Sequence, residues 1–70
     1  MAHFLVDIHG DAHRAMGLLA VAGIETRAWE EPTDRLTARL SAENAESARG
    51  RVLAALMGKD YTVEGIRLES

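Results

Sequence analysis

FLVDIHGDAHRAMGLLAVAGI, residues 4–24, is the stretch of sequence that decides the fold. At its start, Phe4, Val6 and Ile8 are apolar at every second position. That period is typical of a strand with one buried face, so we predict a strand over residues 2–8.

The second part of the stretch changes to a helical period. Gly10 interrupts the strand, and Asp11 stands where a carboxylate can accept the free amide groups of a first helical turn. Gly23 suits the left-handed position that follows a helix, so we predict a helix over residues 12–22. Its apolar stripe contains Ala15, Leu18, Leu19 and Ala22.

The rest of the chain repeats this layout. Alternation predicts strands over residues 24–31 and 35–42, and the sequence Pro32-Thr33-Asp34 is typical of a turn between them. Asn44 is a second candidate cap, opening a helix that runs to Met57 and ends at Gly58. The apolar stripe of this helix contains Ala45, Ala48, Val52, Ala55 and Leu56.

The last predicted strand, residues 61–68, alternates irregularly. Tyr61 and Val63 are in phase with each other, whereas Ile66 and Leu68 are in phase with each other but not with the first pair. A bulge near Gly65 would return all four side chains to the core face.

The predicted order is strand, helix, strand, strand, helix, strand. This order resembles the split βαβ, ferredoxin-like sandwich, an α+β fold. The resemblance implies a single domain over residues 1–70, with a four-stranded antiparallel sheet and both helices on one face.

Composition narrows the class of function. The 70 residues carry 8 basic and 11 acidic side chains, a net charge of −3, whereas a nucleic-acid-binding domain usually has a basic excess. No apolar run is long enough to span a membrane, no signal peptide is recognisable, and cysteine is absent. We expect a cytoplasmic protein, and the abundance of alanine and arginine over lysine suggests a bacterial or bacteriophage source.

The face of the sheet without helices is the candidate interaction surface. It should carry His3, Leu5, Asp7, Arg27, Trp29, Glu31, Arg35, Thr37, Arg39 and Ser41. A solvated polar face is one interpretation. A docking face is the other, because an indole and a leucine among arginines are typical of interface anchors. The candidate interface residues are Leu5, Arg27, Trp29, Arg35 and Arg39.

The expected partner is a protein, a second copy of the chain included. A domain of this size rarely obtains much stability from its own core, which favours a homodimer. Pairing through the edge strands is another route, since neither edge is guarded by lysine. Binding of RNA on the sheet is disfavoured because the outward positions of the two central strands carry no aromatic residue.

The histidines raise the question of a metal site. Asp7, His9, Asp11 and His13 lie at alternate positions, and carboxylate and imidazole are ligands for divalent ions. Asp11 is better used as a helix cap, however, so we expect no metal ion and interpret the histidines as solvated. No phosphate loop, dinucleotide motif or nucleophile beside a histidine is present, so we expect no catalytic residue and no cofactor.

The first third of the chain resembles an ACT-type regulatory domain. Asp7 stands where that family has an aspartate at the end of its first strand, Gly10 lies in the following loop, and LLAVAGI, residues 18–24, closes the helix as in that family. The family usually has proline where His9 stands. The resemblance implies edge-to-edge pairing and binding of an amino acid or anion near the loop, through Asp7, His9, Gly10 and Asp11.

Two functions therefore stand as expectations. The first is a non-catalytic protein-interaction or regulatory domain that acts through its open sheet face or edges. The second is a small-ligand sensor of the ACT type.

Overall fold

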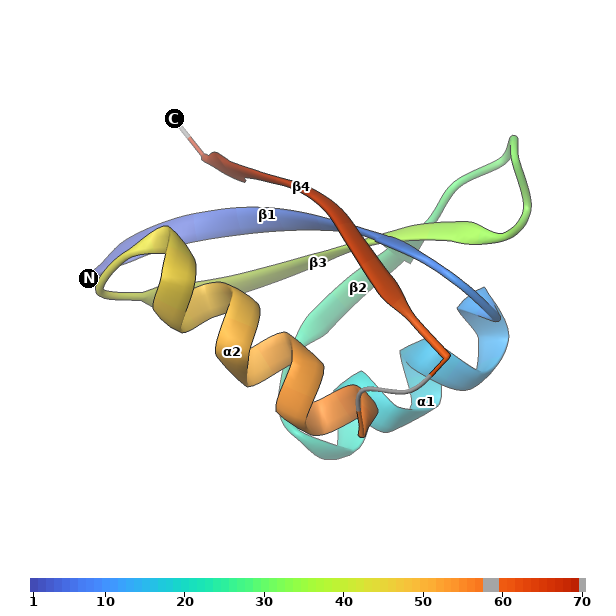
Figure 1. Cartoon of the computed structure of the whole chain (residues 1–70), viewed down its shortest axis with the longest axis horizontal. Coiled ribbons are helices and arrows are strands. Elements are labelled where there is room, and N and C mark those ends of the chain that lie inside the picture. The colour runs from blue at the N-terminus through green and yellow to red at the C-terminus, as the bar shows by residue number, and fades with distance from the viewer. Residues whose placement is uncertain (58–59, 70) are drawn as a thin grey trace.

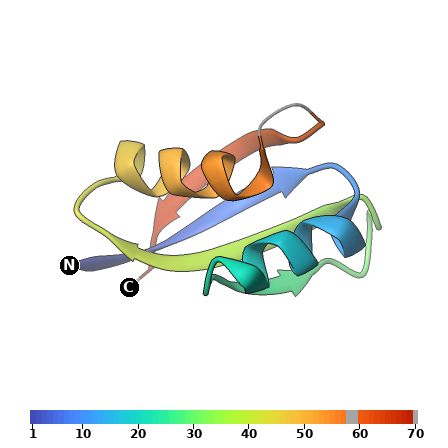
Figure 2. The ribbon, with the colours of Figure 1, turned by 90° about the horizontal axis from the view of Figure 1, so that it is seen from below.

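The computed structural model describes residues 1–57 and 60–69. Its elements, in chain order, are β1 (Ala2–His9), α1 (Ala12–Val21), β2 (Glu25–Ala28), β3 (Arg35–Ala42), α2 (Ala45–Leu56) and β4 (Thr62–Leu68). The strands form one antiparallel sheet in the order β2-β3-β1-β4. Both helices lie on one side of it (Figure 1), and Figure 2 views the molecule from that side. The predicted α+β, ferredoxin-like arrangement is confirmed.

Alternation along β1 and β3 produces the core as predicted. Val6, Ile8, Leu36 and Ala38 are fully buried on the helix side, where they meet Leu19. The other fully buried residues are Ala15, Ala48, Val52 and Leu56. No polar or charged residue is buried within the part of the chain that is described. The sheet and helices are therefore held together by apolar contact.

Three residues that were predicted to face the core are exposed. Ala22 follows the last residue of α1 and Ala45 is the first residue of α2, so each lies where its helix no longer covers the sheet. Leu68 pairs with Phe4 and so points to the helix side, but it is 63% exposed because β4 is an edge strand near its end.

Strand β2 is shorter than predicted. Alternation suggested residues 24–31, but the strand ends at Ala28 because the chain must reverse direction before β3 begins. The Trp29 amide still donates to the Arg35 carbonyl at 3.1 Å, so one ladder bond continues past the strand. The turn region runs from Glu30 to Asp34 and so includes the predicted turn at Pro32-Thr33-Asp34.

The helix ends follow their local sequence. The Asp11 carboxylate accepts the Arg14 amide at 3.2 Å, and the Asn44 side chain accepts the Ser47 amide at 2.8 Å, so both predicted caps are confirmed. Gly23 has φ +78°, as predicted for the residue after α1. Met57, with φ 58°, holds the left-handed position after α2. The role predicted for Gly58 falls on a residue outside those described.

The predicted bulge in β4 is present. Asp7 pairs with Gly65 and Ile8 pairs with Val63, which leaves Glu64 as the extra residue. The bulge returns Val63 and Ile66 to the helix side, where both pack against the core.

Among the helices described, neither is long and apolar enough to cross a membrane.

Candidate functional site

The open face of the sheet is built from alternate residues of all four strands. The pairing of β1 with β3 sets Leu5 opposite Arg39, Asp7 opposite Thr37 and His9 opposite Arg35. The predicted composition of this face is confirmed for β1 and β3, whereas Glu31 lies in the turn after β2. The prediction missed the contribution of β4, which supplies Glu64 and Arg67, and of Glu69 after its end. The sequence analysis could have found them by continuing the alternation of side chains past the bulge to the end of β4.

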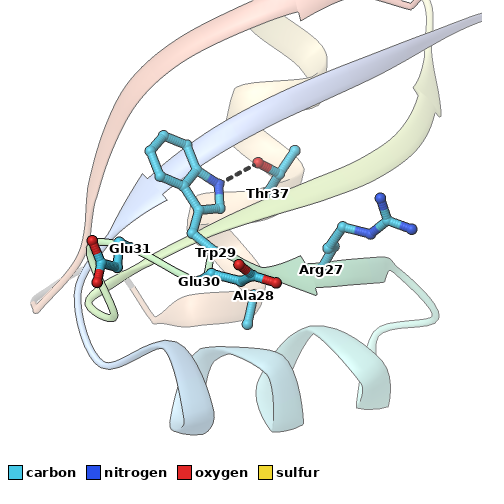
Figure 3. Close-up of a pocket in the computed structure, with 6 residues that line it drawn as sticks. All are labelled: Arg27, Ala28, Trp29, Glu30, Glu31 and Thr37. Atoms are coloured by element: carbon cyan, nitrogen blue, oxygen red, sulfur yellow. Dashed lines mark hydrogen bonds between the residues drawn. The ribbon is translucent and has the colours of Figure 1, made fainter.

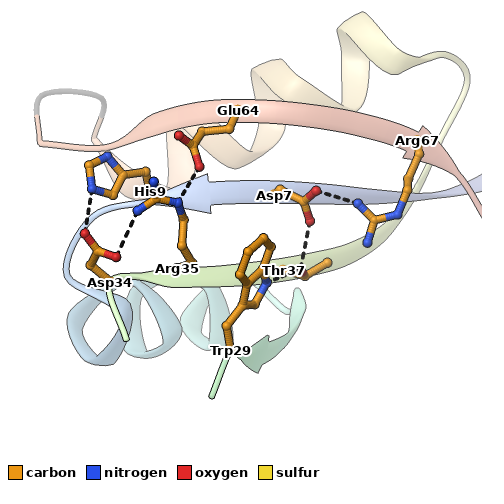
Figure 4. A network of polar contacts seen from close by, with 8 residues as sticks. All are labelled: Asp7, His9, Trp29, Asp34, Arg35, Thr37, Glu64 and Arg67. Atoms are coloured by element: carbon orange, nitrogen blue, oxygen red, sulfur yellow. Dashed lines mark hydrogen bonds and ion pairs between the residues drawn. The ribbon is translucent and has the colours of Figure 1, made fainter. Parts of the chain in front are cut away.

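A chain of hydrogen bonds crosses the middle of this face (Figure 4). The indole Nε1 of Trp29 donates to Thr37 Oγ1 at 2.8 Å, and the Thr37 hydroxyl donates to Asp7 Oδ1 at 2.9 Å. Arg67 donates to the other Asp7 oxygen. Because an indole nitrogen can only donate, the direction of this chain is fixed. As a result, Trp29, the residue after β2, is linked to β3, β1 and β4.

A second cluster lies where β1 ends and β3 begins (Figure 4). His9 Nε2 is 2.8 Å from Asp34 Oδ2, and Arg35 contacts both Asp34 and Glu64. The hydrogen bond from His9 is the main reason that the pKa of the Asp34 carboxyl lies below its ordinary value. His9 is therefore the last residue of β1 and not a loop residue, and it bonds to Asp34 while its side chain stays 43% exposed, in keeping with the interpretation of the histidines as solvated. His13 is exposed on α1, as expected.

Arg39 holds together the third cluster. Its guanidinium contacts Glu69 Oε1 at 2.7 Å and Glu25 Oε2 at 2.9 Å. Hydrogen bonds to Glu69 and then to Glu25 raise the pKa of Arg39 above its ordinary value, so this side chain stays charged. Leu5, the half-buried partner of Arg39 in the register, supplies apolar surface to the same region.

Two open hollows indent the face. Figure 3 shows one of them, lined by Arg27, Ala28, Trp29, Glu30, Glu31 and Thr37. The other borders Leu5, Arg27, Arg39 and Arg67, among others. Four of the five predicted interface residues, Leu5, Arg27, Trp29 and Arg39, thus lie around adjoining hollows. The fifth, Arg35, lies in the Asp34 cluster instead.

The residues around the Trp29 hollow differ in charge pairing from the rest of the face. Arg35, Arg39 and Arg67 each contact at least one carboxylate. Arg27, Glu30 and Glu31 are exposed and form no ion pair with residues 1–57 or 60–69. Free charge of both signs is therefore concentrated beside Trp29, which is 37% exposed.

The residues predicted to bind a small ligand do not converge on one site. Asp7 and His9 are engaged on the open face, and the Asp11 carboxylate caps α1. Gly10 lies against the ring of Tyr61, which leaves no room at that position for even a Cβ atom. Within the described residues, no group of three or more His, Cys, Asp or Glu side chains is close enough to hold a metal ion.

Comparison of the chain with protein-family models, with curated proteins and with solved structures finds no match.

Proposed function

We propose that this protein is a small, non-catalytic interaction or regulatory domain that binds another protein chain through the open face of its sheet. The observation that carries the proposal is the exposed indole of Trp29, held in one orientation by its bond to Thr37. We place the protein in the cytoplasm, as an accessory protein of a bacterium or phage.

A fixed, exposed tryptophan is well suited to binding. Tryptophan, tyrosine and arginine are the residue types enriched among the side chains that contribute most to the binding energy of interfaces. Ordering a side chain on association costs roughly 0.5–1.5 kcal/mol, and a side chain that is already ordered avoids that cost. Thr37, Asp7 and Arg67 supply the ordering here.

The face supports binding better than the sheet edges do. Strand β2 has only four residues, and β4 carries a bulge. Short edge strands and bulges are two devices by which proteins discourage pairing at sheet edges. The structure therefore favours the face over the edge route that the sequence left open.

Protein is a better partner than nucleic acid for this face. Three of its arginines are already paired with carboxylates of the same chain. A phosphate backbone is bound by basic groups that are free to displace counterions, and such groups are not clustered here. The same internal pairing supports a non-catalytic role, because most of the titratable side chains on the face already have partners.

Substitutions at Trp29 test the proposal. Wild-type protein and the Trp29→Ala variant are each immobilised, exposed to a lysate of the source organism and to the free wild-type chain, and compared for what they retain. We expect Trp29→Ala to lose the retained protein and Trp29→Phe, which lacks the indole N–H, to retain part of it. Val21→Ala is the control, because Val21 is 91% exposed on α1. Equal retention by wild type and Trp29→Ala, or none by either, would contradict the proposal.

The second candidate is a small-ligand sensor of the ACT type. It is supported by the shared βαββαβ order and by the resemblance of residues 4–24, while the dispersal of Asp7, His9 and Asp11 weighs against it. A thermal-shift screen over amino acids and anions tests it. A ligand at a hundred times its dissociation constant adds about 2.7 kcal/mol of apparent stability. The absence of any shift would eliminate the sensor.

A further inference from the structure

The charges around Trp29 are arranged in a self-complementary way. Figure 3 shows Arg27 on one side of the indole and Glu31 on the other, with Glu30 between them. We call these four residues, Arg27, Trp29, Glu30 and Glu31, the Trp29 patch. A two-fold interface requires a patch of this kind, because each copy must offer what the other lacks.

We propose that the occupant of the Trp29 patch is a second copy of this chain, related by a two-fold axis that passes close to Trp29. Rotation about such an axis brings Arg27 of each copy toward Glu31 of the other, because the two residues lie on opposite sides of the indole. The two indoles then lie next to each other at the centre, where aromatic side chains favour offset or edge-to-face contact. This inference rests on the proposed function and names its partner.

The pattern of free charge favours a second copy over other proteins. A uniformly acidic segment would meet Glu30 and Glu31, and a uniformly basic segment would meet Arg27. A partner that offers a carboxylate to Arg27 and a cation to Glu31 carries these two charges in the reverse order, which the rotated patch supplies. The other arginines of the face compete little for these groups, because each already contacts a carboxylate of its own chain.

Charge reversal tests this arrangement in sedimentation equilibrium at micromolar concentrations. The wild type is expected to dimerise. Arg27→Glu places like charges together at two symmetry-related positions, and so does the double variant Glu30→Arg/Glu31→Arg. Each is expected to weaken dimerisation by about tenfold or more, the equivalent of about 1.4 kcal/mol.

An equimolar mixture of the two charge-reversal variants is the decisive experiment. In a mixed pair, both contacts join opposite charges again, so the mixture should form heterodimers about as tightly as the wild type dimerises. The triple variant, with all three charges reversed, should recover homodimers. Recovery also excludes misfolding as the cause of the loss. Arg49→Glu, at an exposed position on α2, is the matched control and should dimerise like the wild type.

Three outcomes would overturn the inference: a monomeric wild type, a fully dimeric Arg27→Glu variant, or no recovery in the mixture. These failures are distinct from failure of the proposed function. A monomeric wild type that still retains a different protein through Trp29 leaves the proposed function standing and removes only the second copy as its partner. A protein with no Trp29-dependent binding of any kind removes both.

Discussion

The two faces of the sheet are made by the same strands and are opposite in character. On the helix side, Val6, Ile8 and Leu36 have no solvent exposure. On the open face, the neighbouring residues of the same strands, Asp7 and Arg35, contact charged or polar groups from other strands. The helix side is covered and packed by apolar side chains. The open face carries pairs of polar and charged side chains that are partly exposed to water. The difference separates two roles, since stability depends mostly on the first face, whereas the binding that we propose uses the second.

The energetic scales of the two faces support this division. Burial of apolar area contributes about 25 cal/mol per Å², so a fully buried leucine or isoleucine is worth roughly 1.5–3 kcal/mol. An exposed ion pair contributes roughly 0–1 kcal/mol. The many pairs of the open face are therefore expected to fix the positions of side chains more than they stabilise the fold.

The sharpest test of the comparison replaces one leucine on each face. Leu36→Ala, on the helix side of β3, should destabilise the protein by about 3 kcal/mol because it leaves a cavity. Leu5→Ala, on the open face, should cost less than about 1 kcal/mol. Urea unfolding followed by circular dichroism measures both. Ile8→Val, with an expected cost of about 1 kcal/mol, serves as the milder core variant. Similar losses at Leu36 and Leu5 would break the comparison.

Gly10 extends the packing of the helix side into the first loop. Its φ is +149°, and a Cβ there would lie 2.4 Å from Tyr61 Cδ1. Gly10→Ala should therefore cost about 2 kcal/mol, from backbone strain and displacement of the ring. Gly17→Ala is the control. Nothing lies within 4 Å of its Cβ position, and the substitution should raise the melting temperature, since alanine is favoured in a helix by about 1 kcal/mol. A neutral Gly10→Ala would mean that Tyr61 is free to move.

Asp11 stabilises the helix that covers the core. The Asp11→Ala variant loses the bond to the Arg14 amide and should be less stable by about 1 kcal/mol, as is usual for a helix cap. Asn44→Ala, at the equivalent position of α2, should lose a similar amount. Thermal unfolding of both variants measures the effect. Zinc and chelator should leave the melting temperature of the wild type unchanged, and a chelator effect would instead support a metal ion at Asp11.

Tyr61 is the exception on the apolar side. Its hydroxyl is buried and, among the residues described, is the one side-chain oxygen or nitrogen atom so placed without a hydrogen-bond partner. Because an unsatisfied buried group is costly, Tyr61→Phe should be neutral or stabilise the protein by up to about 1 kcal/mol. Chemical denaturation compares the two proteins. A clear loss of stability in Tyr61→Phe would mean that the hydroxyl has a partner in solution.

The smallest expected effect lies in the Asp34 cluster. The hydrogen bond from His9 lowers the pKa of Asp34 below its ordinary value of 3.8. The folded state therefore binds this proton less readily than the unfolded state, so the contribution to stability is present above about pH 4 and is lost as the pH falls through the folded pKa. Asp34→Asn should flatten the fall in melting temperature below pH 4. Asp60→Asn, at another exposed carboxylate, is the control, and equal curves for wild type and Asp34→Asn would contradict this role.

Local sequence was sufficient to predict the helices and strands and the face of the sheet to which most side chains point. Alternation in residues 35–42 identified β3 and both of its faces, because successive side chains of a strand point to opposite sides whatever else the chain does. Asp11 and Asn44 marked the helix starts because a cap bonds to amides within three residues. The irregular phase around Gly65 identified the bulge for the same local reason.

Only the tertiary structure decided which of these side chains meet. Asp7 and Arg67 are 60 positions apart, and their contact depends on β4 lying beside β1 and on a register shifted by one residue at the bulge. His9 and Asp34 meet because the β2–β3 turn comes back to the end of β1. Arg27 looked like the other arginines of the face in the sequence, and its lack of a partner among the described residues emerged from the placement of every carboxylate around it. Alternation fixes the face of a residue, whereas its neighbours on that face are fixed by strand order and register, which involve the whole chain.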